Sequence, residues 1–335
     1  MKFRLLFAIL LLFALPGNGI LAQYANRQSD QSGGTNRIAN GDITKISAVQ
    51  EYPPGIMFST LLKNVAVNAS GGYFKLGNQM QNVFLPEGST GKVVLSRAGG
   101  SEFCHWKWTL DGFGLRPPYK LFAFKQPLNP DGSNFDISNM KLTVAGDYVI
   151  DFYIGEKRFY TFPFSVKTLE PANPFDGKTM YFTDGAWNDW GYLYYPDANP
   201  EQNLIWKVFL RERSFKRTSH KVNVEITRDN GNKLICQSRP NTTHSFRNDW
   251  VRYDFDMVNP PVKTSGGAYF KAKDLLKVDG GYTLTMKIDG ALYGKWKFKV
   301  IGGKFNYTGK TVRGADPLTF VEGGKDAWWY KRETK

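Results

Sequence analysis

The sequence has few of the residues on which most metal and nucleophilic sites depend. Its 335 residues include three histidines and two cysteines. The histidines, His105, His220 and His244, do not have the spacing of metal ligands, and no HExxH or CxxC motif is present. We therefore predict that the protein binds no metal ion and no cofactor.

Motifs of several large enzyme classes are also absent. No GxSxG turn marks a serine nucleophile, and neither GxGxxG nor a P-loop is present. His105 adjoins Cys104, but adjacent side chains of a strand point to opposite faces, so the pair is not arranged for thiolate–imidazole catalysis. A Ser-His-Asp triad that lacks the GxSxG turn stays open. We predict that the protein has no catalytic residues and is not an enzyme.

Long apolar runs are absent after residue 22. The run Leu5–Leu15 follows a positively charged start and is broken by Pro16. It is shorter than the roughly 20 residues that cross a bilayer, and Ala22 is a small residue suited to cleavage. Residues 1–22 are typical of a signal peptide, so we predict an exported protein, periplasmic or extracellular, with no transmembrane segment in the mature chain. An uncleaved N-terminal anchor is the alternative.

Aromatic residues make up 15% of the chain, and 34 residues are glycine. This combination favours strands and turns over helices. The formal net charge is +14, and the excess is spread along the chain. A basic exported protein is suited to acidic glycans, cell-wall polymers or anionic lipid surfaces. A solvated, mildly basic surface is the plainer interpretation, and nothing indicates a specific nucleic acid.

One pattern occurs twice without a gap. VAGDYVIDFYIGEKRFYTFPFSV begins at Val144, and VDGGYTLTMKIDGALYGKWKFKV begins at Val278. In the second copy apolar residues alternate with polar ones on both sides of a turn that contains Gly290. Period-two alternation around a turn predicts a β-hairpin with one apolar face. The two copies therefore predict two related domains.

The approach to each hairpin resembles a known fold. Tyr148 and Tyr282 each follow a leucine by six residues and a glycine by two. This spacing resembles the L-x-x-x-[DG]-x-Y start of the penultimate strand in immunoglobulin-like and fibronectin-type sandwiches. The resemblance implies that each tyrosine hydroxyl bonds to upstream backbone. It also implies an all-β fold of two tandem sandwiches, but no ligand or chemistry. The antibody-type Cys…Trp…Cys framework is absent, which argues against a true immunoglobulin domain.

Composition suggests where these domains begin and end. Residues 23–49 are polar and poor in aromatics, which is typical of a flexible, disordered leader. The proline-containing stretch 169–178 is the best candidate for a linker. The predicted units are a signal peptide (1–22), a leader (23–49), a first β-sandwich (50–168), a linker (169–178), a second β-sandwich (179–303) and an aromatic-basic tail (304–335).

The two cysteines, Cys104 and Cys236, fall at nearly equivalent positions of the two copies. Two cysteines in an exported protein are consistent with one disulfide. A bridge needs Cα atoms within about 7 Å, and equivalent positions of tandem domains need not meet. We favour two buried structural thiols over a bridge.

The segment 183–203 combines aromatic and acidic side chains. Aromatic rings stack on sugars, and Asp side chains accept hydrogen bonds from hydroxyls. The segment therefore predicts a glycan-binding site formed by Trp187, Trp190, Tyr192, Tyr194, Asp184 and Asp189. The alternative is that its aromatics fill the core and the seam between domains. A third interpretation is a carbohydrate-active enzyme with its site near residues 184–197, since paired carboxylates serve glycoside hydrolysis.

The outer face of the second hairpin carries Lys295, Lys297 and Lys299, where the first copy has Thr161, Pro163 and Ser165. These lysines are a candidate surface for an anionic polymer, or they face solvent and protect a sheet edge from pairing. Together these patterns predict an exported, non-enzymatic binding or structural protein of the cell envelope or extracellular space. Its expected partner is carbohydrate or a surface protein.

Overall fold

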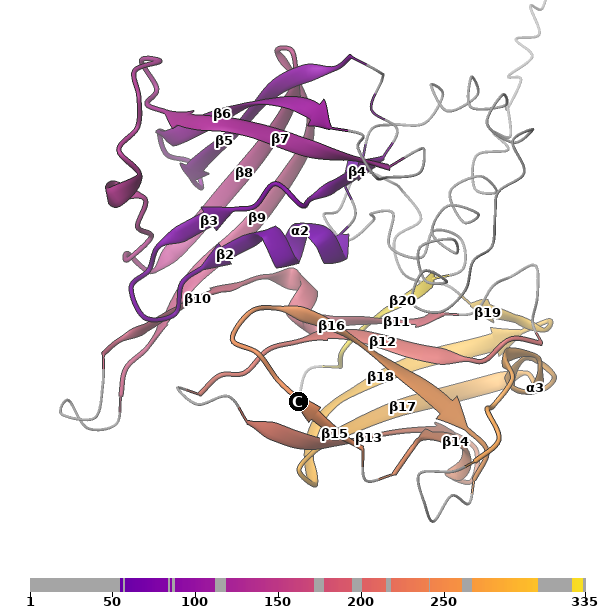
Figure 1. Cartoon of the computed structure of the whole chain (residues 1–335). Coiled ribbons are helices and arrows are strands. Elements are labelled where there is room, and N and C mark those ends of the chain that lie inside the picture. The colour runs from indigo at the N-terminus through magenta and orange to yellow at the C-terminus, as the bar shows by residue number, and fades with distance from the viewer. Residues whose placement is uncertain are drawn as a thin grey trace, which may run out of the picture.

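The computed structural model describes residues 55–56, 58–83, 85, 88–111, 119–171, 178–194, 201–214, 218–240, 242–260, 267–306 and 327–333. The predicted signal peptide and leader, residues 1–49, lie outside these ranges. The described part is almost entirely antiparallel β-structure, which confirms the predicted all-β class. Figure 1 shows two lobes, which we define as the described residues from 55 to 184 and from 190 to 333. None of the helices in the described ranges is both long and apolar enough to span a bilayer.

The first lobe is built on one eight-stranded antiparallel sheet. In spatial order its strands are β1 (Gly55–Ile56), β4 (Gln81–Val83), β7 (Tyr119–Leu128), β6 (Glu102–Asp111), β5 (Thr90–Arg97), β8 (Gly146–Ile154), β9 (Lys157–Leu169) and β10 (Met180–Asp184). A second layer consists of helix α2 (Phe58–Asn64) and the hairpin β2 (Val65–Val67) and β3 (Phe74–Leu76). The chain after the 3-10 helix η4 (Ile137–Asn139) bonds to this hairpin, since Phe74 N donates to Met140 O.

The second lobe is one hydrogen-bonded sheet that folds over on itself. Its order is β19 (Lys304–Asn306), β18 (Ala291–Ile301), β17 (Gly280–Ile288), β13 (Ser219–Arg228), β14 (Lys233–Ser238), β16 (Val251–Val258), β12 (Ile205–Leu210), β11 (Trp190–Tyr194) and β20 (Ala327–Lys331). Strand β15 (Thr243–Ser245) also pairs with β13, and helix α3 (Ala272–Leu276) lies between β16 and β17 in the chain. Trp206 of β12 meets Trp296 of β18 with ring centroids 5.0 Å apart, so the two halves of the sheet face each other.

The duplicated hairpins have the same local structure. Each carries a register shift at the same place, after Phe152 in β8 and after Met286 in β17. Tyr148 Oη donates to Val144 O at 2.9 Å, and Tyr282 Oη donates to Val278 O at 2.6 Å. The predicted tyrosine-to-backbone hydrogen bond is therefore confirmed in both copies.

A glycine precedes each tyrosine because the backbone there has an unusual conformation. Gly146 and Gly280 both have φ of 148°, a region that side chains rarely adopt. This conformation lets the strand begin directly after the segment to which the tyrosine bonds. The Gly-x-Tyr spacing is therefore a backbone requirement in both copies.

The hydrogen bonding assigns several segments to sheets. Strand β10 pairs with β9, so residues 180–184, which follow the predicted linker, belong to the first sheet. Within the predicted tail, β19 pairs with β18 and β20 pairs with β11. The domain limits 50–168 and 179–303 stay predictions, but the described part of the tail supplies strands to the second lobe.

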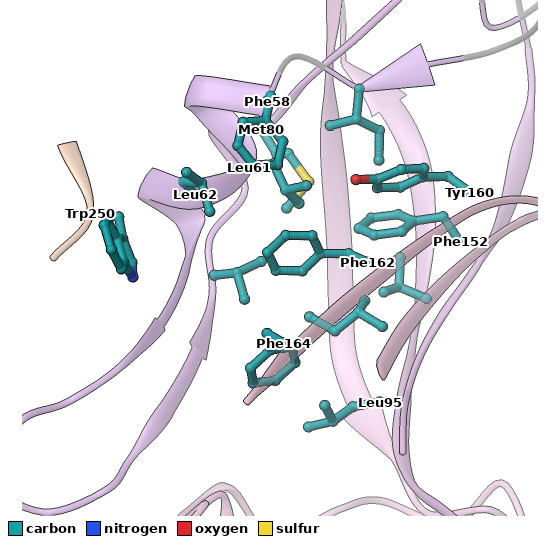
Figure 2. Packing of buried hydrophobic residues seen from close by; sticks show 14 of the residues in the cluster. Phe58, Leu61, Leu62, Met80, Leu95, Phe152, Tyr160, Phe162, Phe164 and Trp250 are labelled. Atoms are coloured by element: carbon teal, nitrogen blue, oxygen red, sulfur yellow. The ribbon is translucent and has the colours of Figure 1, made fainter. Parts of the chain in front are cut away.

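The two hydrophobic cores meet between the lobes. Figure 2 shows the first core, in which Phe152, Phe162 and Phe164 of the sheet face helix α2, and Trp250 of the second lobe lies near Leu62. Phe58 of α2 packs edge-on against Phe209 of β12, with ring centroids 5.2 Å apart. We call this contact the seam; its aromatic residues are Phe58, Phe162, Trp187, Phe209, Trp250 and Trp329.

Replacing Tyr148 or Tyr282 by phenylalanine should lower the free energy of unfolding by about 0.5–1.5 kcal/mol each, because one partly buried hydrogen bond is lost. Urea unfolding measures the change. Tyr73→Phe is the matched control, since this tyrosine is 46% exposed. Equal losses of unfolding free energy in all three variants would show that the two tyrosine-to-backbone hydrogen bonds add nothing to stability.

Candidate functional site

The aromatic-acidic segment crosses from one lobe to the other. It leaves β10 at Asp184, forms the 3-10 helix η5 (Ala186–Asp189) and continues as β11. Trp187 is 2% exposed, Tyr192 1% and Tyr194 4%, whereas Trp190 is half-buried. Residues 195–200 lie outside the described ranges. The segment is therefore a buried connection over most of its described length.

The buried rings are occupied by packing. Trp187 stacks on Phe162 with centroids 5.2 Å apart and meets Trp250 edge-on at 5.7 Å. Tyr192 lies 4.4 Å from Trp329, and the Lys207 ammonium lies 4.3 Å from the Tyr194 ring centre. A sugar needs an exposed ring face for stacking. Trp187, Tyr192 and Tyr194 have none, so the predicted glycan platform is not formed by these three rings, which instead belong to the seam and to β11.

The polar residues of the same segment hold neighbouring strands. The Asp189 carboxylate accepts from Arg332 Nη2 at 2.6 Å, and its backbone carbonyl accepts from Trp296 Nε1 at 3.3 Å. Asn188 Oδ1 accepts from Arg213 Nη2 at 3.3 Å and from Tyr293 Oη at 3.4 Å. Asp184 Oδ1 accepts from the backbone N–H of Gly185. The predicted Asp184 and Asp189 therefore bond to the protein itself in this structure.

The lysines of the second hairpin face solvent, as their alternation predicts. Lys295, Lys297 and Lys299 are exposed, while Trp296, Phe298 and Val300 between them are buried. Lys297 pairs with Glu333 at 2.9 Å. Strand β18 is not a free edge at its end, because β19 pairs with it over Lys299–Ile301. We call the three side chains the lysine face.

Both cysteines are buried and unbridged, which confirms the preference for two structural thiols. Burial, with a smaller effect from Glu102, raises the pKa of Cys104 to about 12, and burial raises the pKa of Cys236 well above its usual value. The reactive form of cysteine is the thiolate. Neither thiol is therefore a nucleophile at neutral pH.

A cluster that sequence spacing did not indicate surrounds His220. The two ring nitrogens contact different carboxylates: Nε2 lies 2.8 Å from Glu212 and Nδ1 lies 2.6 Å from Asp289. Thr218 Oγ1 donates to Glu212 and lies 2.7 Å from His220 Nε2, while the Phe246 ring packs on the imidazole at 4.7 Å. Glu212 is 8 residues and Asp289 is 69 residues from His220 in the chain. Only the folded sheet brings them together.

The cluster resembles a hydroxyl–imidazole–carboxylate triad, but its electrostatics oppose that chemistry. Burial disfavours the charged imidazole, but hydrogen bonds to Glu212 and Asp289 outweigh it and raise the pKa of His220 above 6.5. Burial likewise opposes the charged Glu212, but hydrogen bonds from Thr218, His220 and the Arg213 backbone lower its pKa to about 2. A general base must start unprotonated. The carboxylates at both ring nitrogens favour the protonated imidazole, which suits a structural ion pair better than a general base.

Comparisons with known proteins add no family. The chain matches no family model and has no significant match among curated proteins or solved structures. Within the described residues, no group of three or more His, Cys, Asp or Glu side chains has a metal-binding arrangement. The functional argument therefore depends on the residues of this chain alone.

Trp187→Ala should lower the free energy of unfolding by about 3–5 kcal/mol, because a large buried ring leaves a cavity at the seam. Thermal or urea unfolding measures the loss. Ile301→Ala, at a side chain 57% exposed, should change stability by less than about 0.5 kcal/mol. A stable Trp187→Ala protein that no longer binds a glycan would instead restore the glycan-platform hypothesis.

The His220 cluster predicts a bounded pH range of stability. Because the folded-state pKa of His220 is raised, its contribution is complete below about pH 6.5 and is lost as pH rises through the folded value. Because the pKa of Glu212 is lowered to about 2, its contribution is complete above about pH 4.5 and is lost as pH falls toward 2. The cluster should therefore stabilise the fold most between about pH 4.5 and 6.5.

Unfolding free energies of the wild type and His220→Gln, measured from pH 4 to 9, test this range. The difference between the two proteins should shrink as pH rises above 6.5. Comparing the two proteins removes the effect of His244, whose pKa is lowered by burial and whose contribution is instead lost at low pH. A difference that is independent of pH would show that His220 is not charged in the fold.

Proposed function

We propose that this protein is an exported, non-enzymatic binding protein of the cell envelope or extracellular space that contacts an anionic polymer through the lysine face. The observation that carries the proposal is the row of exposed lysines at alternate positions of β18. Alternate residues of a strand are about 6.6–6.8 Å apart. The three ammonium groups therefore project from one regular, rigid surface.

The surroundings of the lysine face carry charges of both signs. Lys287 of β17 and Lys221 of β13 are exposed lysines of the same sheet. Glu333 neutralises part of the charge through its pair with Lys297, and the negative charge of Asp229 also acts on Lys297. Exposed ion pairs are individually weak and are screened by salt. Binding at such a surface therefore needs several charges on the partner, as an acidic glycan or a cell-wall polymer provides.

Carbohydrate or a surface protein remains the wider class of partner that we propose, and the burial of the seam rings favours charge over stacking as the means of recognition.

The absence of enzymatic activity is also part of the proposal. Its support is that His220 lies between two carboxylates and His105 contacts Glu102 at 2.5 Å. A carbohydrate-active enzyme near residues 184–197 is less favoured, because Asp189 is bonded to Arg332.

We also propose that the two lobes arose by duplication of an immunoglobulin- or fibronectin-type sandwich. The support is the pair of tyrosine hydrogen bonds and the matching register shifts of the two hairpins. In this proposal the lysine face is a difference that arose after duplication, since the first copy has Thr161, Pro163 and Ser165 at the aligned positions.

Replacing Lys295, Lys297 and Lys299 together by glutamine should weaken binding to heparin about ten- to a hundredfold, since each surface pair is worth up to about 1 kcal/mol. Binding of the wild type should fall steeply between about 0.05 and 0.2 M salt because exposed charges are screened. Isothermal titration at several salt concentrations measures both effects. Neutral dextran is the uncharged comparison.

The matched control replaces three exposed lysines of the first lobe, Lys107, Lys125 and Lys167, by glutamine. The charge change is the same, so this variant should bind heparin almost as the wild type does. Equal losses in both triple variants would show that the overall charge, rather than the lysine face, attracts the polymer. Heparin binding that salt does not weaken would contradict an electrostatic surface.

A further inference from the structure

Arg211 is a buried cation at the seam with most of its hydrogen-bonding groups unused. It follows β12 and is 7% exposed. Its guanidinium stacks on the Phe182 ring, 3.6 Å from the ring centre, and lies 5.3 Å from the centre of Trp250. Nη1 donates to Glu212 O at 3.4 Å, but Nε and Nη2 have no hydrogen-bond partner. Arginine is almost never fully buried unless it is paired.

The two unpartnered groups are on the same edge of the guanidinium. Nε–H and one Nη2–H point in parallel from a planar group, an arrangement that matches the two oxygens of a carboxylate. Phe182 stacks on the guanidinium and Trp250 lies close by, so this edge is the part of the group left for a polar partner. An unmade hydrogen bond at a buried donor is costly.

A second donor nearby is also unpartnered. Trp187 Nε1 is buried without an acceptor, and Trp187 packs on the same Trp250 ring that Arg211 approaches. Trp250 itself is satisfied, because its Nε1 donates to Thr183 O at 2.9 Å. Buried donors without acceptors are rare in folded proteins. Two such donors therefore lie beside one ring of the seam.

Charges of both signs lie around Arg211. Burial lowers the pKa of Arg211 to about 10, and the positive charge of Arg213 lowers it further, while Asp184 and Glu212 oppose this effect. The Glu212 carboxylate is engaged by Thr218 and His220. Arg213 is exposed and lies two residues along the chain, where it can attract an anion from solvent.

We propose that the seam binds a small carboxylate anion, which the Nε and Nη2 edge of Arg211 receives in a two-point contact. Phe182 and Trp250 flank the guanidinium, and Arg213 supplies a second positive charge. Binding requires local opening of the seam, since the edge of Arg211 is covered in this structure. The site is separate from the lysine face, so this proposal goes beyond the proposed function and stands or fails without it.

Thermal unfolding of the whole protein in sodium acetate, sodium glucuronate and sodium chloride, at equal ionic strength, tests the site. The carboxylates should raise Tm by about 2–4 °C over chloride at ten times their Kd, because a ligand of the folded state stabilises it. Arg211→Met should remove this difference. Arg158→Met, which removes an exposed guanidinium of the first lobe, should retain it.

A titration of the wild type keeps the test valid if Arg211→Met does not fold. The Arg211 Nε–H resonance, assigned by sequential connectivity, should shift downfield and saturate with acetate or glucuronate. A resonance that does not move, a Tm that responds equally to chloride, or an Arg211→Met protein with the wild-type response would each overturn the proposal. A response to a hexaglutamate peptide alone would also overturn it, since the carboxylate would then belong to a protein partner.

Discussion

Aromatic packing at the seam is the interaction on which the arrangement of the two lobes depends. Phe58 of the short helix α2 inserts between Trp187 and Phe209, which come from the connection between lobes and from the second lobe. Burial of several large rings contributes far more than the weak polar contacts of an exposed linker. The first sheet, α2 and the outer face of β12 therefore share one hydrophobic core, which holds the two lobes together.

Burying the seam also buries charged side chains at its edge. Leu210 continues the core, but the chain then passes through Arg211, Glu212 and Arg213, which alternate between the seam and the His220 cluster. Glu212 is fully satisfied by hydrogen bonds, whereas Arg211 is not. These two adjacent charged residues therefore differ in their hydrogen bonding. Glu212 holds three segments of the second lobe together, whereas Arg211 keeps two unused donors inside the protein.

The two hairpins agree where the core requires it and differ on their outer faces. The inner residues of both hairpins are buried, and both tyrosines bond to backbone four residues earlier. The outer faces have no such constraint, since solvent accepts many side chains. The lysine face of the second hairpin is the clearest such difference. The strands beside the two hairpins correspond, since β10 pairs with β9 as β19 pairs with β18.

The sequence by itself determined the all-β class, the two related hairpins, the tyrosine hydrogen bonds and the exposure of Lys295, Lys297 and Lys299. These follow from alternation and from a short motif, which are local properties of the chain. Only the tertiary structure decided that Trp187 and Tyr192 are buried, that β20 pairs with β11, and that Glu212 and Asp289 meet at His220. A ring or a carboxylate has the same local signal whether it faces solvent or another lobe, because its environment depends on contacts between residues far apart in the chain.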